Sequence, residues 1–189
     1  EKVPVDIFAK APNQYTTIVH MKAGNSIRAF NGTNGWMAGP DTAIPLVTLT
    51  EGNLDRARLE ALVAFPAGIP QAYPHWRTGR AVLHDEEVTV VQGIDDDRLA
   101  TANLYFAQSG LLVRAVRWTL TPVGFVPTQI DYSNFRDVAG VKVAFTRKVS
   151  QTFMQMTVEL TDVQPNASVD AATFARPQPV ARRLGADGV

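Results

Sequence analysis

Apolar and polar residues alternate along most of this 189-residue chain, with the period of two that is typical of strands with one buried face. The segment Tyr15–Met21 shows the pattern, since Tyr15, Thr17, Val19 and Met21 fall on one side of an extended backbone. The same alternation predicts strands over Ser26–Phe30, Trp36–Ala38, Val88–Gln92, Leu104–Phe106, Leu111–Leu120, Pro127–Ser133, Val141–Lys148 and Phe153–Leu160. Because short turns separate many of these runs, we expect an antiparallel meander in a mainly β (α+β) protein.

Two local signals interrupt or join the strands. Asn31-Gly32 is a strong hairpin dipeptide because both residue types tolerate a positive φ. A helix is predicted over Asn53–Phe65, with Asn53 as its cap and one apolar stripe at Leu54, Ala57, Ala61 and Phe65, with Leu62 beside it. A second, short helical turn is predicted at Asp170–Phe174.

The composition narrows the classes of function. The 18 Lys and Arg residues balance 18 Asp and Glu residues, so the chain lacks the basic field that binding to nucleic acid would need. There is no cysteine, which excludes thiolate metal sites and a covalently attached c-type haem. The length predicts one domain over residues 1–177, followed by a flexible tail over residues 178–189.

Chemically reactive arrangements are scarce in the sequence. No nucleophile elbow, zinc-protease helix, phosphate loop or dinucleotide fingerprint is present, so we expect no catalytic residue, no metal and no cofactor. The alternative of an acid–base pair rests on His84 with Asp85 or Glu86, and on His20. We interpret the run from His84 to Glu87 as a solvated turn between strands.

Large apolar side chains gather on one side of several predicted strands. Leu112, Val116 and Trp118 are expected to share a face, as are the following sets: Ile130 with Tyr132; Val141, Val143 and Phe145; and Met154, Met156, Val158 and Leu160. One helix offers limited cover for such a face, so either the sheet closes on itself or a cavity remains. Methionines there would suit a flexible ligand, because thioether side chains adapt to irregular shapes.

The order of these segments resembles the outer-membrane lipoprotein-sorting (LolA-like) family. The matching pieces are Phe8–Tyr15, Phe30–Trp36, Leu104–Phe106 with Gly110–Val113, Asp131–Phe135, Gly140–Phe145, and Asn166 followed by Val169, Asp170, Phe174 and Pro177. Val113–Trp118 and Pro127–Phe145 are also similar to a module at the C-terminal end of bacterial proteins classed as reaction-centre-type cytochrome c subunits. Their haem motif lies in a preceding domain.

The resemblance implies a strongly curved, incomplete, barrel-like antiparallel sheet whose concave face is covered by a helical lid. It implies a non-enzymatic, periplasmic or otherwise extracytoplasmic bacterial module that binds a lipid or lipoprotein acyl chain between sheet and lid. The side chains expected to line that cavity are Trp36, Leu62, Phe65, Phe106, Trp118, Tyr132, Phe145, Met154 and Met156.

The resemblance also carries expectations about partners. The family begins with a helix and a first strand before the segment that matches Val5–Tyr15, so we expect these to be missing and a homodimer to form through the open sheet edge. In lipoprotein carriers an arginine before the Pro-Asn turn contacts the lid, whereas Ala11 stands here with Lys10 beside it. The alternative function is a protein-interaction or accessory module that works with a lipoprotein or a preceding cytochrome domain.

Overall fold

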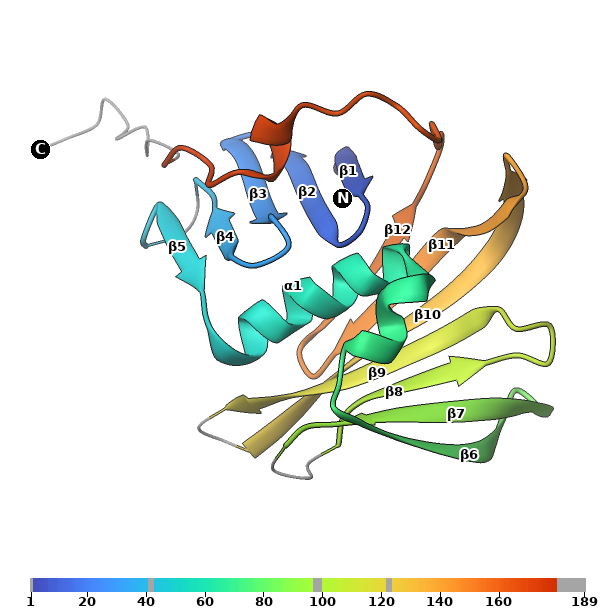
Figure 1. The fold of residues 1–189 in the computed structure, drawn as a ribbon. Helices are drawn as coiled ribbons and strands as arrows, with labels where there is room; N and C mark the ends of the chain where they lie inside the picture. Colours follow the sequence, from blue (N-terminus) through green and yellow to red (C-terminus); the bar gives the residue numbers. More distant parts are fainter. Residues whose placement is uncertain (1, 41–42, 97–99, 122–123, 180–189) are drawn as a thin grey trace, which may run out of the picture. The chain divides into compact units, whose positions relative to one another are not determined.

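The computed structural model describes residues 2–40, 43–96, 100–121 and 124–179. The chain divides into two compact units, Glu1–Ala72 with Ser168–Val189, and Tyr73–Ala167, each built on one antiparallel sheet. Both sheets keep their strands in sequence order (Figure 1), so the predicted meander is confirmed. The single domain over residues 1–177 stays a prediction, and residues 180–189 of the predicted tail lie outside the described residues.

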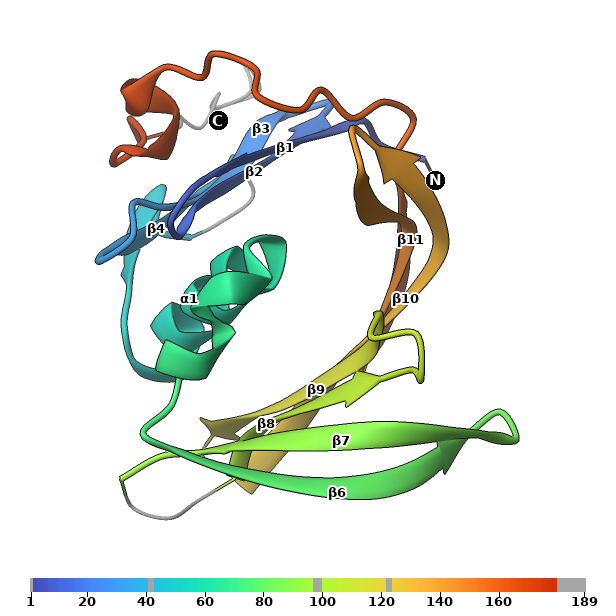
Figure 2. The same cartoon turned by 45° about the vertical axis from the view of Figure 1, so that its right-hand side comes forward.

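In the residues that the structure describes, the first unit holds a five-stranded sheet, one α-helix and two 3-10 helices. Its elements are β1 (Val5–Lys10), β2 (Gln14–Met21), β3 (Gly24–Phe30), β4 (Gly35–Ala38), β5 (Leu46–Leu49), α1 (Glu51–Ala64), η1 (Pro66–Gln71) and η2 (Ala171–Phe174). Both α1 and η2 contact β2 and β3, and Figure 2 shows them on opposite sides of this sheet. The sheet is therefore covered on both faces, which explains why β2 is buried on both sides at Tyr15 and Thr16.

The core of this unit lies between the sheet and α1. Tyr15, Phe30 and Leu49 form one apolar cluster with Ala57 and Ala61 of the helix, and all five are at most 8% exposed. The two alanines confirm the middle of the predicted helical stripe. Their small side chains leave room for the aromatic rings of the sheet, so the packing depends on a large residue facing a small one.

The helix begins earlier than the sequence predicts, because Thr50 and not Asn53 is its cap residue. Thr50 has an extended backbone that continues from β5, and its carbonyl accepts hydrogen bonds from the N–H groups of Asn53 (3.1 Å) and Leu54 (3.3 Å). Asn53 therefore lies inside the first turn. At the other end Phe65 has left the helical conformation (φ −129°), and Ala64 takes its place against the core.

The opposite face of the sheet is closed by the C-terminal segment. The predicted turn at Asp170–Phe174 is confirmed as η2, and the carboxylate of Asp170 caps it by accepting from the Ala172 N–H (2.8 Å). Phe174 is 1% exposed, and the hydroxyl of the fully buried Thr16 donates to the carbonyl of Thr173 (2.9 Å). This hydrogen bond satisfies a polar group that burial would otherwise penalise.

The predicted Asn31-Gly32 turn is confirmed, although the two residues act differently. Gly32 takes the positive φ of 100°, whereas the side-chain oxygen of Asn31 accepts from the N–H groups of Thr33 (3.0 Å) and Asn34 (2.8 Å). A side chain that bonds its own turn in this way stabilises a loop without regular structure. Asn13 adds a hydrogen bond to the Gly32 carbonyl (3.2 Å), so the two loops at this end of the sheet are tied together.

The second unit is a seven-stranded sheet. Its strands are β6 (His75–Leu83), β7 (Glu86–Ile94), β8 (Ala100–Phe106), β9 (Leu112–Thr121), β10 (Gly124–Val138), β11 (Val141–Gln151) and β12 (Met154–Glu159). The sequence predicts every one of them except β6, which carries exposed polar residues along most of its length. Among the described residues, no helix is long and apolar enough to cross a membrane.

Candidate functional site

One row of side chains crosses the whole seven-stranded sheet and is apolar at six of its seven positions. Strand register places the row, one residue per strand from β6 to β12, at Thr78, Val91, Leu104, Ala115, Ile130, Val149 and Met156. Residues paired across antiparallel strands project from the same side of a sheet. We call this side the apolar face.

The adjacent row belongs to the other side and has the opposite character. It runs through Arg77, Gln92, Asn103, Val116, Gln129, Ser150 and Gln155, and Val116 is its single apolar member. Amide side chains bond to one another or to hydroxyls along it, as in Gln92 Nε2 to Asn103 Oδ1 (3.0 Å) and Gln155 Nε2 to Ser150 Oγ (3.2 Å). We call this side the polar face. The contrast shows that burial of one side of the sheet sets the sequence pattern.

Five of the nine side chains predicted to line a cavity lie on the apolar face. Each of them either belongs to the apolar row or lies an even number of residues from the row's member on the same strand. They are Phe106, Tyr132, Phe145, Met154 and Met156. Phe145 is 6% exposed and lies under the guanidinium of Arg136, whose Cζ is 4.3 Å from the ring centre. Met154 and Met156 are 48% and 40% exposed on the terminal strand β12.

Trp118 lies on the polar face, where it pairs with Pro127. Val116 shares this face but Leu112 does not, so the expectation that Leu112, Val116 and Trp118 share a face is wrong for Leu112. The register of β8 and β9 shifts between Tyr105 and Phe106, so that Leu112 pairs with Phe106 on the apolar face. A β-bulge adds one residue to one strand and reverses the side on which the following side chains project. Alternation alone does not reveal such a shift.

Sequence reasoning missed two buried polar residues on the apolar face. Arg117 is 8% exposed and Thr128 is 5% exposed, and they pair with each other across β9 and β10. Arg117 Nη1 donates to the hydroxyl of Thr119 (3.0 Å), and Gln151 Nε2 donates to the hydroxyl of Thr128 (3.4 Å). Alternation along β9 could have revealed Arg117. It stands two residues from Ala115, so both side chains project from the same side of the strand.

The remaining three predicted residues belong to the first unit. Trp36 pairs with Ala29, which in turn pairs with Thr16, so it lies on the side of the five-stranded sheet that faces η2 and not α1. Leu62 is 8% exposed and contacts η1, since a Cβ added to Gly68 would come within 2.8 Å of its Cδ2. Phe65 is the half-buried residue that ends α1.

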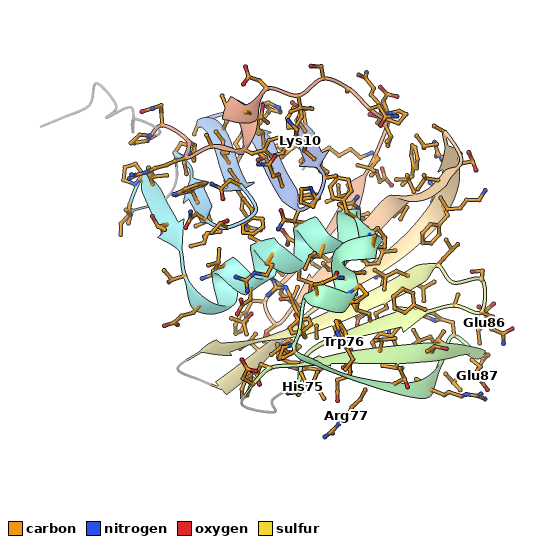
Figure 3. The ribbon with its side chains drawn as sticks, in the orientation of Figure 1. Lys10, His75, Trp76, Arg77, Glu86 and Glu87 are labelled. Carbon is orange, nitrogen blue, oxygen red and sulfur yellow. The ribbon has the colours of Figure 1, made fainter. Side chains whose placement is uncertain are left out.

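The histidines do not assemble into a reactive cluster. His84 and Asp85 have φ values of 51° and 65° and form the two-residue turn between β6 and β7, as predicted. Figure 3 shows Glu86 and Glu87 at that end of the hairpin and His75 with Trp76 at the other end. Within the described ranges, no group of three histidine, aspartate or glutamate residues is placed to hold a metal ion.

His20 is the histidine with a defined electrostatic environment. Its Nε2 lies 2.8 Å from Asp6 Oδ2 and its Nδ1 lies 3.1 Å from Asn25 Oδ1. The hydrogen bond to Asp6, and after it the one to Asn25, raises the pKa of His20 above the usual 6.5. Both side chains of the ion pair are exposed to solvent, at 38% and 58%, which is typical of a surface link between β1 and β2.

We expect a pH titration followed by NMR to give His20 a pKa above 6.5, and Asp6→Asn to bring it down. Because the folded-state pKa is raised, the pair stabilises the fold fully below the unfolded-state value, and this stabilisation is lost as the pH rises through the folded-state pKa. Asp55→Asn, which removes a carboxylate paired with Arg58, should leave the titration of His20 unchanged. An equal response to both substitutions would contradict the assignment.

Comparison with known proteins gives structural matches only. No protein-family profile and no curated protein sequence matches this chain. A domain assigned to outer membrane lipoprotein sorting from Vibrio parahaemolyticus is similar in fold, with a TM-score of 0.55 and 8% identity over 91% of this chain and 80% of that one. A DUF1329 family protein from Desulfovibrio piger matches with a TM-score of 0.56 and 9% identity over 90% of this chain and 79% of that one.

A LolA superfamily protein from Nitrosomonas europaea is also similar. The TM-score is 0.50 and the identity 14%, over 86% of this chain and 79% of that one. At such identities the likeness concerns the fold alone. Together with the strand order of the two sheets, it confirms the LolA-like, mainly antiparallel β architecture that the sequence predicts.

Proposed function

We propose that this chain is a non-enzymatic, extracytoplasmic binding module for hydrophobic ligands, namely the acyl chains of a lipid or a lipoprotein. The observation that supports it most is the apolar row across all seven strands, which stands beside a polar row on the other side of the same sheet. The LolA-like fold, and the lipoprotein-sorting role named for one structure that shares it, point the same way.

We propose the apolar face as the surface that the ligand contacts. Its aromatic and thioether side chains Phe106, Tyr132, Met154 and Met156 offer area to an acyl chain without any reactive group, whereas the contribution of the buried Phe145 stays a prediction. Burying such a chain stabilises a complex by about 0.8 kcal/mol per methylene, so a long chain can be held by contact alone. The curved sheet, the helical lid, the periplasmic location and the contributions of Trp36, Leu62, Phe65 and Trp118 stay predictions.

Native mass spectrometry of the gently purified chain tests the first part of the proposal. We expect a bound species of several hundred daltons, on the order of one acylated lipid, that organic extraction removes, and displacement of a fluorescent fatty acid by the same extract. A bare chain that also fails to bind the probe would contradict the proposal. A bare dimer would instead favour the protein-interaction module. That role and the cytochrome-associated role both stay predictions.

A matched pair of substitutions tests the binding surface. Ile130 and Val116 are both half-buried aliphatic residues, on the apolar and polar faces respectively. We expect Ile130→Asn to weaken probe binding by about tenfold or more, since full burial of such a side chain contributes roughly 1.5–3 kcal/mol, whereas Val116→Asn should bind as the parent does. Met156→Asn, at a 40% exposed position, gives the same test without threatening the fold. Equal losses of probe binding for substitutions on both faces would contradict the assignment of the binding surface to the apolar face.

A further inference from the structure

We propose that a small pocket in the first unit binds an oxyanion, that is a carboxylate or phosphate group. The pocket has a volume of about 130 Å³ and lies among β3, β4, β5 and the first turns of α1. Arg28, Met37, Val47, Leu49, Asn53 and Arg56 are among its lining residues. This inference goes beyond the proposed function, because it concerns a different sheet and needs no hydrophobic ligand.

The lining of the pocket carries two positive charges and no acidic side chain. Among the described residues, Glu60 is the carboxylate that pairs with both arginines, and it lies outside the lining: its Oε1 is 2.8 Å from Arg56 Nε and its Oε2 is 3.8 Å from Arg28 Nη1. One carboxylate therefore faces two guanidinium groups. Counting the described residues alone, these three side chains carry an excess of one positive charge.

The two arginines also have N–H donors that the described residues leave without an acceptor. Within the part of the chain that the structure describes, the Arg28 side chain makes no hydrogen bond and has only the long ion pair to Glu60. Arg56 uses its Nε for Glu60, and its two terminal nitrogens are left for another acceptor. A guanidinium group presents five N–H donors, so most of the donors of this pair have no acceptor among the described residues.

Partial burial weakens the hydration of the two guanidinium groups. The side chains of Arg28 and Arg56 are only 31% and 17% exposed. Desolvation lowers the pKa of Arg28, and the attraction of Glu60 only partly opposes it. An anion that accepted from both guanidinium groups would replace the hydration that burial removes.

The shape and chemistry of the pocket fit a group of a few atoms. Its volume of about 130 Å³ is well above the roughly 10–15 Å³ that a single water molecule needs, so it can take a group of a few atoms. The planar guanidinium fork matches the two oxygens of a carboxylate or phosphate, and such charge-assisted bonds are about twice as strong as neutral ones. Met37, Val47 and Leu49 supply an apolar wall, which strengthens the interaction by excluding water.

Calorimetric titration of the full chain with sodium phosphate, and separately with acetate, at low ionic strength tests the pocket. We expect saturable binding of at least one of the two, and a loss of about tenfold or more in affinity in Arg28→Gln and in Arg56→Gln. Arg58→Gln is the matched control, because Arg58 lies on the same helix but is 46% exposed and paired with Asp55. Absence of binding by both anions, or equal losses in all three variants, would overturn the proposal.

Two further measurements complete the experiment. Glu60→Gln removes the competing carboxylate while keeping the size of the side chain, so it should tighten phosphate binding, and unchanged or weaker binding would count against the pocket. Dodecyl phosphate below its micelle concentration distinguishes the source of the anion. Tighter binding than inorganic phosphate, lost in Arg28→Gln, indicates the headgroup of an amphiphile, and equal affinity indicates a free ion.

Discussion

Replacing Phe30 with alanine is expected to lower the free energy of unfolding of the first unit by about 3–5 kcal/mol. Phe30 is 1% exposed and lies at the centre of the cluster formed by Tyr15, Leu49, Ala57 and Ala61. The ring is held between a sheet and a helix that presents alanines, so its neighbours fill only part of the space that it leaves. The cost therefore includes a cavity as well as the lost burial.

Denaturant unfolding followed by Trp36 fluorescence, in a background with Trp76→Phe and Trp118→Phe, measures this loss. Trp36 pairs with Ala29, next to Phe30, so its emission reports on the first unit. Phe153→Ala is the matched control, because the same atoms are removed at a position that is 95% exposed, and its effect should stay within about 0.5 kcal/mol. A loss below about 1 kcal/mol in Phe30→Ala would show that the cluster is not the core of this unit.

The elements that the sequence predicts well are those in which one periodicity runs without interruption. β2 and β11 contain the alternating runs from which they are predicted, and the stripe at Ala57 and Ala61 lies against the sheet. In these elements the residue pattern and the tertiary packing agree. The Asn31-Gly32 turn is predictable for the same reason, since its residue chemistry is local.

The features that could not be predicted depend on partners distant in sequence. Leu112 and Trp118 lie on opposite faces because of a register shift between β8 and β9, which no local pattern marks. Trp36 faces η2, a segment more than a hundred residues later in the chain. It shares a row of paired residues with Ala29 and Thr16, and the hydroxyl of Thr16 donates to the carbonyl of Thr173. β6 carries no alternating apolar face and is a strand because β7 pairs with it.

The helix α1 shows how the two kinds of information combine. Its predicted stripe faces the five-stranded sheet, but Leu59 and Leu62, at 6% and 8% exposure, are buried as well. By the 3.6-residue period Leu59 lies on the opposite side of the helix from Ala57, and Leu62 lies between the two sides. Helices with one apolar stripe are surface helices, whereas a second stripe indicates cover on two sides. The sequence contains this second stripe, and it can be recognised only once the first has been assigned to the sheet.

In the second unit, replacing Gly93 with alanine is expected to cost about 1–3 kcal/mol by overpacking. A Cβ at this position would lie 2.7 Å from Cε2 and 2.8 Å from Cγ of Tyr73. The ring cannot move freely, because it stacks edge-on with Trp76 at a centroid distance of 5.2 Å, and Trp76 is the strand partner of Gly93. The glycine is therefore required by the approach of an aromatic ring and not by its backbone conformation.

Gly79→Ala is the matched control, since Gly79 lies on the neighbouring strand β6 and an added Cβ would meet nothing within 4 Å. We expect this substitution to be neutral or slightly stabilising, because alanine loses less backbone entropy than glycine on folding. Chemical denaturation of both variants gives the comparison, and repeating Gly93→Ala in a Tyr73→Ala background should remove most of its cost. If Gly93→Ala were as stable as Gly79→Ala, Tyr73 would not occupy the position over the strand that the structure assigns to it.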